Sequence, residues 1–359
     1  MTYRNGLVVG KFAPLHRGHE LVITNALAQC ERVHVLSYSK PELARCEPAR
    51  RQAWIERSFP NVHCVVVDDA WLRARGVAPS IVVPNNDAED AVQRDFVSYL
   101  CREELQIAVD AVFTSEDYGD GFARSLTRGL RARWPDHPEI AHVSIDRARQ
   151  LVPISATSIR ADPHARRDYL SAHVYSNFVD RIAILGGEST GKSTLAIALA
   201  RHFATECVAE YGRELWEARE GRLEYADLLS IAEQQVEREQ RASAQSLRYL
   251  FCDTSPATTL WYCLDLFGRA EPKLRALASR RYPLQVLCAP DFPFVQDGTR
   301  RDDAFRHRQH DWYLKHLECN EDPWLLATGP IEERVRQVEA ALSRSDAGRA
   351  AAAGVSTLF

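Results

Sequence analysis

A short apolar run near the middle of the chain ends in a glycine-framed turn and leads into a helix-like segment. Residues 182–185 are apolar, and they are followed by Gly186, four further residues, and then Gly191, Lys192 and Ser193. This spacing fits the phosphate-binding loop pattern. A phosphate chain needs a concave nest of backbone N–H groups, and glycine lets the backbone turn that tightly and approach that closely. We therefore predict a nucleotide-phosphate site here.

The polar residues of this loop each have a predicted role. The following helix N-terminus is electropositive, the Lys192 ammonium reaches the outer phosphates, and the Ser193 hydroxyl suits Mg²⁺. Arg300 lies in a charged loop that suits a lid over phosphates, the alternative being a solvated loop. The predicted ATP-binding residues are Gly186, Gly187, Glu188, Ser189, Thr190, Gly191, Lys192, Ser193, Thr194 and Arg300.

Length and charge limit the classes of protein to consider. The chain has 359 residues, more than a typical single domain of about 100–200, so we expect two domains. The net charge of −4 gives no general reason to bind nucleic acid or an anionic membrane. The nine cysteines include no C-x-x-C pair, which favours reduced thiols over disulfides or zinc. No signal peptide or membrane-length apolar run is found, so we expect a cytoplasmic protein.

A second glycine loop follows the first apolar run, residues 7–9. It reads Gly10-Lys-Phe-Ala-Pro-Leu-His-Arg-Gly-His19 and precedes a helix-like stretch. His16 and His19 lie three residues apart at the helix start, so both imidazoles can face one ligand. They would donate hydrogen bonds to a phosphate and favour the charge that builds on it during displacement. Lys11 adds a positive charge at the start of the loop.

Apolar strand-like runs alternate with helix-like runs on both sides of the central loop. The strand-like runs include residues 111–114, 284–288 and 324–327, and the last helix-like run covers residues 331–342. This alternation predicts an α/β protein with two parallel-sheet domains, whose ligands bind at the carboxyl ends of the strands. We expect a first domain over residues 1–172 and a second over 178–345. The alanine- and glycine-rich tail, residues 346–359, allows disorder and is assigned no function.

Two acids in the second half follow strand-like runs. Glu210 comes after a run near Cys207, with Arg213 close behind, and Asp253 comes directly after residues 249–252. An acid at this place in a P-loop domain is expected to support Mg²⁺ or to act as a base. Ordinary helix capping is the alternative. The sequence does not decide which carboxylate is the base.

Two segments of the first half resemble the paired signature of the HxGH nucleotidylyltransferases. The first is the loop from Gly10 to His19, and the second is Ile154-Ser-Ala-Thr-Ser-Ile-Arg160. The resemblance implies a Rossmann-like fold in which the first segment holds the α-phosphate of ATP and the second the outer phosphates. The residues implied are Gly10, Lys11, Phe12, His16 and His19, with Thr157, Ser158 and Arg160.

Four further motifs are Phe113-Thr-Ser-Glu116, Gly187-Glu-Ser-Thr-Gly-Lys-Ser-Thr194, Glu210-Tyr-x-Arg213-Glu214 and Cys252-Asp-Thr254. With these motifs the chain resembles, from residue 6 to about 327, the bifunctional NadR family, in which an adenylyltransferase precedes a ribosylnicotinamide kinase. The resemblance implies that ribosylnicotinamide is phosphorylated and the resulting mononucleotide adenylylated to NAD, with MgATP consumed twice. Family members that regulate transcription carry a helix-turn-helix before the first glycine loop, and only six residues precede that strand here. We therefore expect small-molecule partners and neither nucleic acid nor membrane.

The acceptor residues are less well defined than the phosphate residues. A cationic pyridinium favours an aromatic face, for which the candidates are Trp71 in the first domain and Trp261, Tyr262 or Phe294 in the second. The charged substrate-binding candidates are Glu210, Arg213, Asp253 and Asp297. Two alternatives stay open: a similar fusion that acts on another small metabolite, and a non-catalytic sensor of NAD or ATP. The sequence also leaves open the oligomeric state, a homo-oligomer included.

Overall fold

The computed structural model describes residues 2–296 and 300–355. The chain divides into two compact units, Met1–Tyr175 and Ser176–Phe359. Each unit is a parallel sheet covered by helices, which confirms the α/β class and the two parallel sheets. No described helix combines the length and the hydropathy that crossing a bilayer would require.

The first unit contains a five-stranded parallel sheet in the order β3-β2-β1-β4-β5. The chain leaves β1 for one side of the sheet and later crosses to the other. Such a reversal of strand order opens a crevice at the carboxyl ends of the strands. The strands are β1 (Tyr3–Gly10), β2 (Cys30–Tyr38), β3 (His63–Val67), β4 (Ala111–Thr114) and β5 (Ala141–Ser144). The helices are α1 (Arg17–Gln29), α2 (Pro48–Ser58), α3 (Asp69–Ala74), α4 (Asp90–Tyr99), the π-helical η1 (Leu100–Glu104), α5 (Gly119–Arg131), α6 (Ala156–Ala161), the 3-10 turn η2 (Arg167–Tyr169) and α7 (Ala172–Tyr175).

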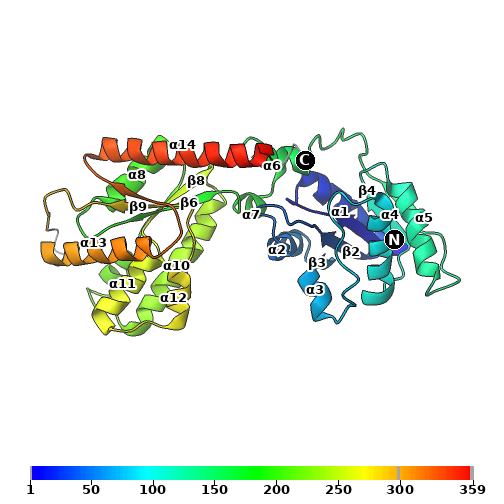
Figure 1. Cartoon of the computed structure of the whole chain (residues 1–359), viewed down its shortest axis with the longest axis horizontal. Coiled ribbons are helices and arrows are strands. Elements are labelled where there is room, and N and C mark those ends of the chain that lie inside the picture. The colour runs from blue at the N-terminus through cyan, green and yellow to red at the C-terminus, as the bar shows by residue number, and fades with distance from the viewer. Residues whose placement is uncertain (1, 297–299, 356–359) are drawn as a thin grey trace. The chain divides into compact units, whose positions relative to one another are not determined.

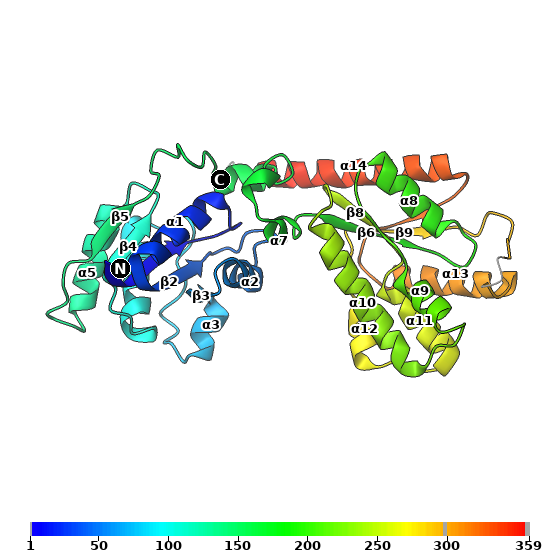
Figure 2. The ribbon, with the colours of Figure 1, turned by 180° about the vertical axis from the view of Figure 1, so that it is seen from behind.

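The two faces of this sheet carry different helices. Leu7, Leu36 and Val112 face a core that includes Phe96 of α4 and Leu126 of α5. Helices α1 and α2 contact the sheet through other buried residues and cover its second face (Figure 2). The site at the carboxyl ends of β1 and β4 therefore rests on a sheet fixed from both sides.

The second unit repeats this plan with the order β10-β9-β6-β8-β7. From the central strand β6 the chain passes first to β7 and β8 on one side of the sheet and then to β9 and β10 on the other. The strands are β6 (Asp180–Leu185), β7 (Cys207–Val208), β8 (Tyr249–Asp253), β9 (Leu284–Cys288) and β10 (Trp324–Ala327). The helices are α8 (Lys192–His202), α9 (Tyr211–Ala218), α10 (Tyr225–Ser243), α11 (Pro256–Phe267), α12 (Pro272–Ala278), α13 (Asp303–Glu318) and α14 (Ile331–Val355).

Helices α8 and α14 cover one face of the second sheet, and α10 to α13 lie on the other (Figure 1). Successive side chains of β6 point to opposite faces of the sheet, which explains this division. Ile182 and Ile184 pack against Leu199 of α8 and Val338 of α14. Ala183 and Leu185 pack against Tyr313 and Leu317 of α13.

Three elements differ from the sequence prediction. The short helices α3 and α9 were not expected, because six or eight residues are too few for a periodic pattern to stand out. Helix α14 continues to Val355, although an end near Leu342 was predicted. Residues 346–355 of the predicted tail therefore belong to this helix. The run Ala350–Ala353 consists of the strongest helix former and explains the extension.

Candidate functional site

In the first unit, the loop between β1 and α1 brings two imidazoles face to face. The rings of His16 and His19 are stacked with centroids 3.7 Å apart, and Phe12 packs edge-on against His19 at 4.9 Å. His16 is the N-cap of α1, and its Nδ1 accepts a hydrogen bond from the Gly18 N–H at 3.1 Å. This contact orients the ring, so Nε2 is the nitrogen left to meet a ligand.

Both histidines are buried enough to lose their charge. Burial, followed by the positive charges of Arg149 and Arg160, lowers the pKa of His16 to about 4. Burial, followed by neighbouring His16, lowers the pKa of His19 well below its usual value. At neutral pH these rings are therefore uncharged hydrogen-bonding groups, and positive charge at this site comes from arginine.

The structure brings the segment 154–160 against the first glycine loop. Arg160 Nη1 donates to the Ala13 carbonyl at 2.6 Å, and its Nη2 donates to Thr157 Oγ1 at 3.1 Å. Ser158 forms a capping box with Ser155, donating from Oγ to the Ser155 carbonyl at 2.9 Å. The two sequence segments thus form one site, with the guanidinium of Arg160 at their junction.

The remaining residues of this loop are spread around that junction. Gly10 ends β1, and Phe12 is buried with a positive φ of 47°. Lys11 is exposed and donates from Nζ to the Asn86 carbonyl at 3.3 Å.

In the second unit, the loop between β6 and α8 needs its glycines. Gly186 has φ +145°, and a side chain there would lie 2.7 Å from Thr190 Oγ1 and 3.0 Å from the Cys288 carbonyl. Gly191 has φ +80° and is the N-cap of α8. Lys192 Nζ donates to the Gly187 carbonyl at 3.0 Å, which folds the ammonium back over the loop. Ser189, with φ 57°, and Gly191 are left-handed residues of this loop, a conformation from which phosphate-binding nests are built.

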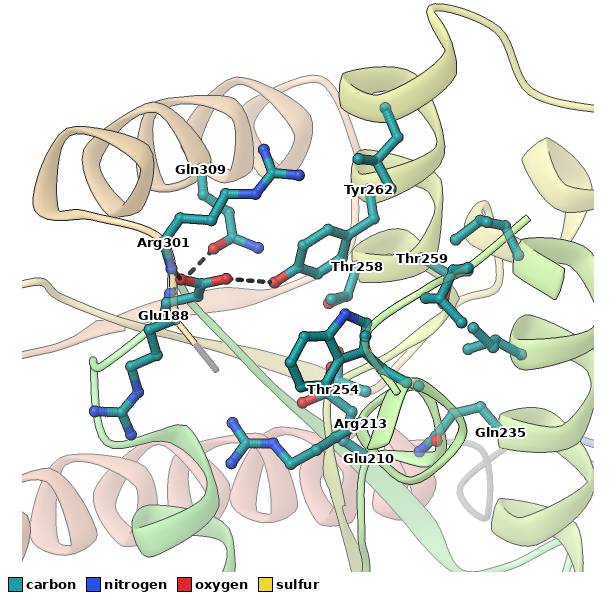
Figure 3. Close-up of a pocket in the computed structure, with 18 of the residues that line it drawn as sticks. Glu188, Glu210, Arg213, Gln235, Thr254, Thr258, Thr259, Tyr262, Arg301 and Gln309 are labelled. Atoms are coloured by element: carbon teal, nitrogen blue, oxygen red, sulfur yellow. Dashed lines mark hydrogen bonds between the residues drawn. The ribbon is translucent and has the colours of Figure 1, made fainter. Parts of the chain in front are cut away.

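A cavity of about 520 Å³ adjoins this loop (Figure 3). Such a volume lies within the range of small-ligand pockets. Its wall is mixed polar and apolar, and includes Glu188, Lys192, Glu210, Arg213, Trp216, Gln235, Thr254, Thr258, Tyr262, Arg300, Arg301 and Gln309. A small polar molecule with a ring could therefore sit beside bound phosphates.

Glu188 connects the loop to this cavity. Its Oε1 accepts from the Tyr262 hydroxyl at 3.2 Å, and its Oε2 accepts from the Arg301 backbone N–H at 2.8 Å. Its own N–H donates to Gln309 Oε1 at 3.0 Å. Figure 3 shows Tyr262 of α11 and Arg301 of the loop before α13 at the carboxylate, and Gln309 of α13 at the backbone N–H of Glu188.

The two candidate carboxylates occupy different places. Glu210 lines the cavity as the N-cap residue of α9. Burial and the neighbouring carboxylate of Asp253 raise its pKa, against the opposing effect of Lys192. Asp253 ends β8 and is 5% exposed, and no donor among the described residues reaches its Oδ1. Glu210 faces the cavity, and Asp253 lies deeper.

Comparison with known proteins covers both units. A family model described as an AAA domain matches residues 181–334. The trifunctional NAD biosynthesis/regulator protein NadR of Escherichia coli strain K12 is 29% identical over 311 residues, covering 82% of this chain and 71% of that protein. Its Salmonella typhimurium counterpart is 28% identical over the same coverage. The chain is therefore similar to NadR over most of its length.

Solved NadR structures share this fold. One, in complex with NR, covers 96% of both chains with a TM-score of 0.69 and 20% identity. Another, in complex with NAD and AMP-PNP, covers 91% of both chains with a TM-score of 0.65 and 19% identity.

Some predicted acceptor residues lie away from the cavity. Trp261 is 4% exposed and packs edge-on against Tyr262 and Phe305, so it belongs to the core. Trp71 is half-buried, and the Arg75 guanidinium lies 4.4 Å over its ring. Asp297 lies outside the described residues. Arg213 lines the cavity, and Arg300 lines it while donating to Ser189 Oγ at 3.2 Å.

Several cavity residues were not predicted. Trp216 lies on α9 two residues beyond the motif that ends at Glu214, and Gln235 lies on a helix with no motif around it. Gln309 lies inside a helix of ordinary polar composition. Thr254 offered a usable signal, since it directly follows Asp253. Its φ of 87° places a non-glycine residue in the left-handed region, a strain common at functional sites.

No group of three or more His, Cys, Asp or Glu side chains within 2–296 and 300–355 is arranged to hold a metal. A P-loop Mg²⁺ does not need one, because phosphates and water supply most of its ligands. The unpartnered Asp253 Oδ1 and the Ser193 hydroxyl at the start of α8 fit that mode of binding.

Proposed function

We propose that this protein makes NAD in two steps. Residues 178–345 would phosphorylate ribosylnicotinamide with ATP to give nicotinamide mononucleotide. Residues 1–172, as a Rossmann-like HxGH nucleotidylyltransferase, would then adenylylate the mononucleotide with a second ATP to give NAD and pyrophosphate. The observation that carries the proposal is the presence of two separate phosphate loops, one of them beside an acceptor-sized cavity, in a chain of the NadR type.

In the kinase step, the 5′-hydroxyl oxygen would attack the γ-phosphorus as the bond to the β–γ bridging oxygen breaks and ADP leaves. We assign the base to Glu210, because it lines the cavity and its raised pKa makes it a better proton acceptor. Lys192 and the amides from Gly186 to Thr194 would hold the phosphates, and Arg300 would cover them. Arg213 would bind the acceptor beside Glu210.

Mg²⁺ would be held by ATP, the Ser193 hydroxyl and Asp253. When bound, it would neutralise charge on the phosphate oxygens during transfer. This leaves Asp253 as a metal-side carboxylate and Glu210 as an acceptor-side carboxylate.

In the adenylyl step, a phosphate oxygen of the mononucleotide would attack the α-phosphorus of ATP. The bond between the α-phosphorus and the α–β bridging oxygen would break, and pyrophosphate would leave. Uncharged His16 and His19 would donate hydrogen bonds to the α-phosphate near Gly10, Lys11 and Phe12. Thr157 and Arg160 would hold the departing pyrophosphate. Ser158 would reach it only by releasing its contact with Ser155.

The nicotinamide ring is expected to meet an aromatic face. Tyr262 and Trp216 line the cavity, whereas Trp261 is turned into the core, so the first two are the better candidates for a pyridinium contact. Trp71 remains the candidate in the first unit.

The test is a pair of separate assays on the purified chain. MgATP with ribosylnicotinamide should yield ADP and the mononucleotide, and MgATP with the mononucleotide should yield NAD and pyrophosphate. A panel of other nucleosides and mononucleotides should react more slowly. Faster turnover of another acceptor would favour a fusion enzyme for a different metabolite, and nucleotide binding without turnover would favour a sensor.

A further inference from the structure

Among the residues that the structure describes, the largest fully buried side chains are two arginines, one in each unit. Arg51 of α2 and Arg334 of α14 are both 0% exposed. Arginine is almost never fully buried unless it is paired. Neither residue belongs to a motif that the proposed function uses, so their burial requires a separate explanation.

Arg334 joins three backbone segments around the P-loop. Its Nη1 donates to the Thr190 carbonyl at 2.8 Å, inside the loop. Its Nη2 donates to the Ala289 carbonyl after β9 at 3.1 Å, and its Nε donates to the Gly329 carbonyl after β10 at 2.8 Å. Asp291 pairs with Nη2, and the Phe292 ring lies 4.5 Å from the guanidinium carbon.

Arg51 holds the other phosphate loop in a similar way. Its Nη1 donates to the Lys11 carbonyl at 3.2 Å and to Ser37 Oγ at 3.0 Å. Ser37 Oγ itself donates to the same Lys11 carbonyl at 3.1 Å. Arg51 Nη2 donates to both carboxylate oxygens of Glu42 at 2.8 Å. In both units a buried guanidinium therefore grips a carbonyl of the phosphate loop and is anchored by one carboxylate.

This arrangement answers a requirement of phosphate loops. A loop that turns its N–H groups toward an anion leaves carbonyls on its outer side, and buried carbonyls need donors. A planar guanidinium offers five donors in a fixed fork, so it can bind several carbonyls and fix their spacing at once. An ammonium on a flexible stem can satisfy one carbonyl without fixing the others.

We propose that Arg51 and Arg334 are positioning residues, each setting the shape of the phosphate loop of its own unit and hence the affinity of that unit for ATP. The inference rests on the proposed function, because it assigns the two loops to two ATP-dependent steps. If these arginines only stabilised the fold, an apolar side chain of similar size could fill either site without a buried charge.

The conservative variants Arg334→Lys and Arg51→Lys test the proposal. Arg334→Lys should raise the KM for ATP in phosphorylation by about 10- to 100-fold, because small displacements of positioning groups have effects of this size. The KM for ATP in adenylylation should stay unchanged. Arg51→Lys should give the reverse pattern.

Two further arginines serve as matched controls. Arg280 pairs with fully buried Glu239 at 3.5 Å, and Arg102 donates to the Gly129 carbonyl at 3.1 Å and pairs with Glu103. Arg280→Lys and Arg102→Lys should lower the thermal midpoint without a change in either KM for ATP. Equal KM effects from the controls, or no KM effect from folded Arg334→Lys and Arg51→Lys, would overturn the proposal.

The carboxylate partners keep the test decisive if a lysine variant does not fold. Asp291→Asn and Glu42→Gln leave the arginine in place but loosen its anchor, and should each raise the same KM by a smaller factor. Unchanged KM values in both would refute the inference. Absence of both activities in the unaltered protein would instead refute the proposed function.

Discussion

The two phosphate loops of this protein share a plan and differ in chemistry. Each follows the strand at which its sheet reverses order, and each has a buried arginine behind it. The second loop is built from one continuous segment, Gly186 to Thr194, with Lys192 as its cation. The first depends on a partner 147 residues away, because Arg160 supplies the guanidinium that its uncharged histidines lack.

This difference teaches that a local nest and a tertiary site can serve the same ligand group. Attack at the γ-phosphorus needs the end of the phosphate chain to be held beside an acceptor, which a loop next to a cavity provides. Attack at the α-phosphorus needs hydrogen-bond donors at the α-phosphate and a separate cation for the leaving pyrophosphate. If the division is correct, damage to one loop should leave the other activity intact.

The largest effect is expected for Lys192→Ala. Loss of the ammonium removes charge stabilisation of the transferring phosphoryl group, so phosphorylation of ribosylnicotinamide should fall by about 10³-fold. Adenylylation should be unchanged when each step is assayed alone. The control Lys315→Ala, on the exposed side of α13, should affect neither step. A normal rate of phosphorylation in Lys192→Ala would contradict the kinase assignment.

Glu210→Gln separates the two carboxylates of the second unit. Removing the base should lower kcat for phosphorylation by about 10²- to 10³-fold, with little change in the KM for ATP. Asp253→Asn should instead raise the Mg²⁺ concentration needed for half-maximal rate. Glu237→Gln, an exposed glutamate on α10, is the control. The reverse pattern, with Asp253→Asn altering kcat alone, would exchange the two roles.

His19→Ala tests the first phosphate loop in the same way. Loss of one hydrogen-bond donor to the α-phosphate should lower adenylylation by about 10²-fold and leave phosphorylation intact. His63→Ala, at an exposed position on β3, controls for loss of an imidazole. If His19→Ala slowed both steps equally, the two loops would not be independent.

The smallest effect concerns pH. Because burial lowers the pKa of His16 to about 4, its imidazole is already uncharged at pH 6 and stays so at pH 8. The ratio kcat/KM for adenylylation, which reports the free enzyme, should therefore change less than about twofold from this group over that range. A decrease of tenfold per pH unit above 6.5 that disappears in His16→Gln would show that the charged ring is required.

Most of the fold could be predicted from the sequence because both sheets consist of short apolar runs. The strands at 111–114, 284–288 and 324–327 occur where they were expected. The strand near Cys207 was expected, but helix α9 was missed because eight residues show too little periodic pattern. The extension of α14 was not predicted because Gly348 and Gly354, which disfavour a helix, flank the alanine run.

The phosphate loops could be predicted because their chemistry is concentrated in adjacent residues. The acceptor cavity could not, since Trp216, Gln235 and Gln309 come from three helices and meet only after folding. Trp261 illustrates the difficulty. It is next to Tyr262 in sequence, yet one side chain is in the core and the other lines the cavity. The buried arginines also leave no local signal, because an arginine in a polar helix normally faces water.

Glu188 has a consequence for how this enzyme could change over evolution. The residue is part of the nucleotide loop and, through Tyr262 and Arg301, part of the acceptor wall. A mutation there would alter the choice of acceptor and the grip on ATP together. New acceptors should therefore be gained through the helical side of the cavity, where Trp216 and Gln235 can vary without disturbing the nucleotide.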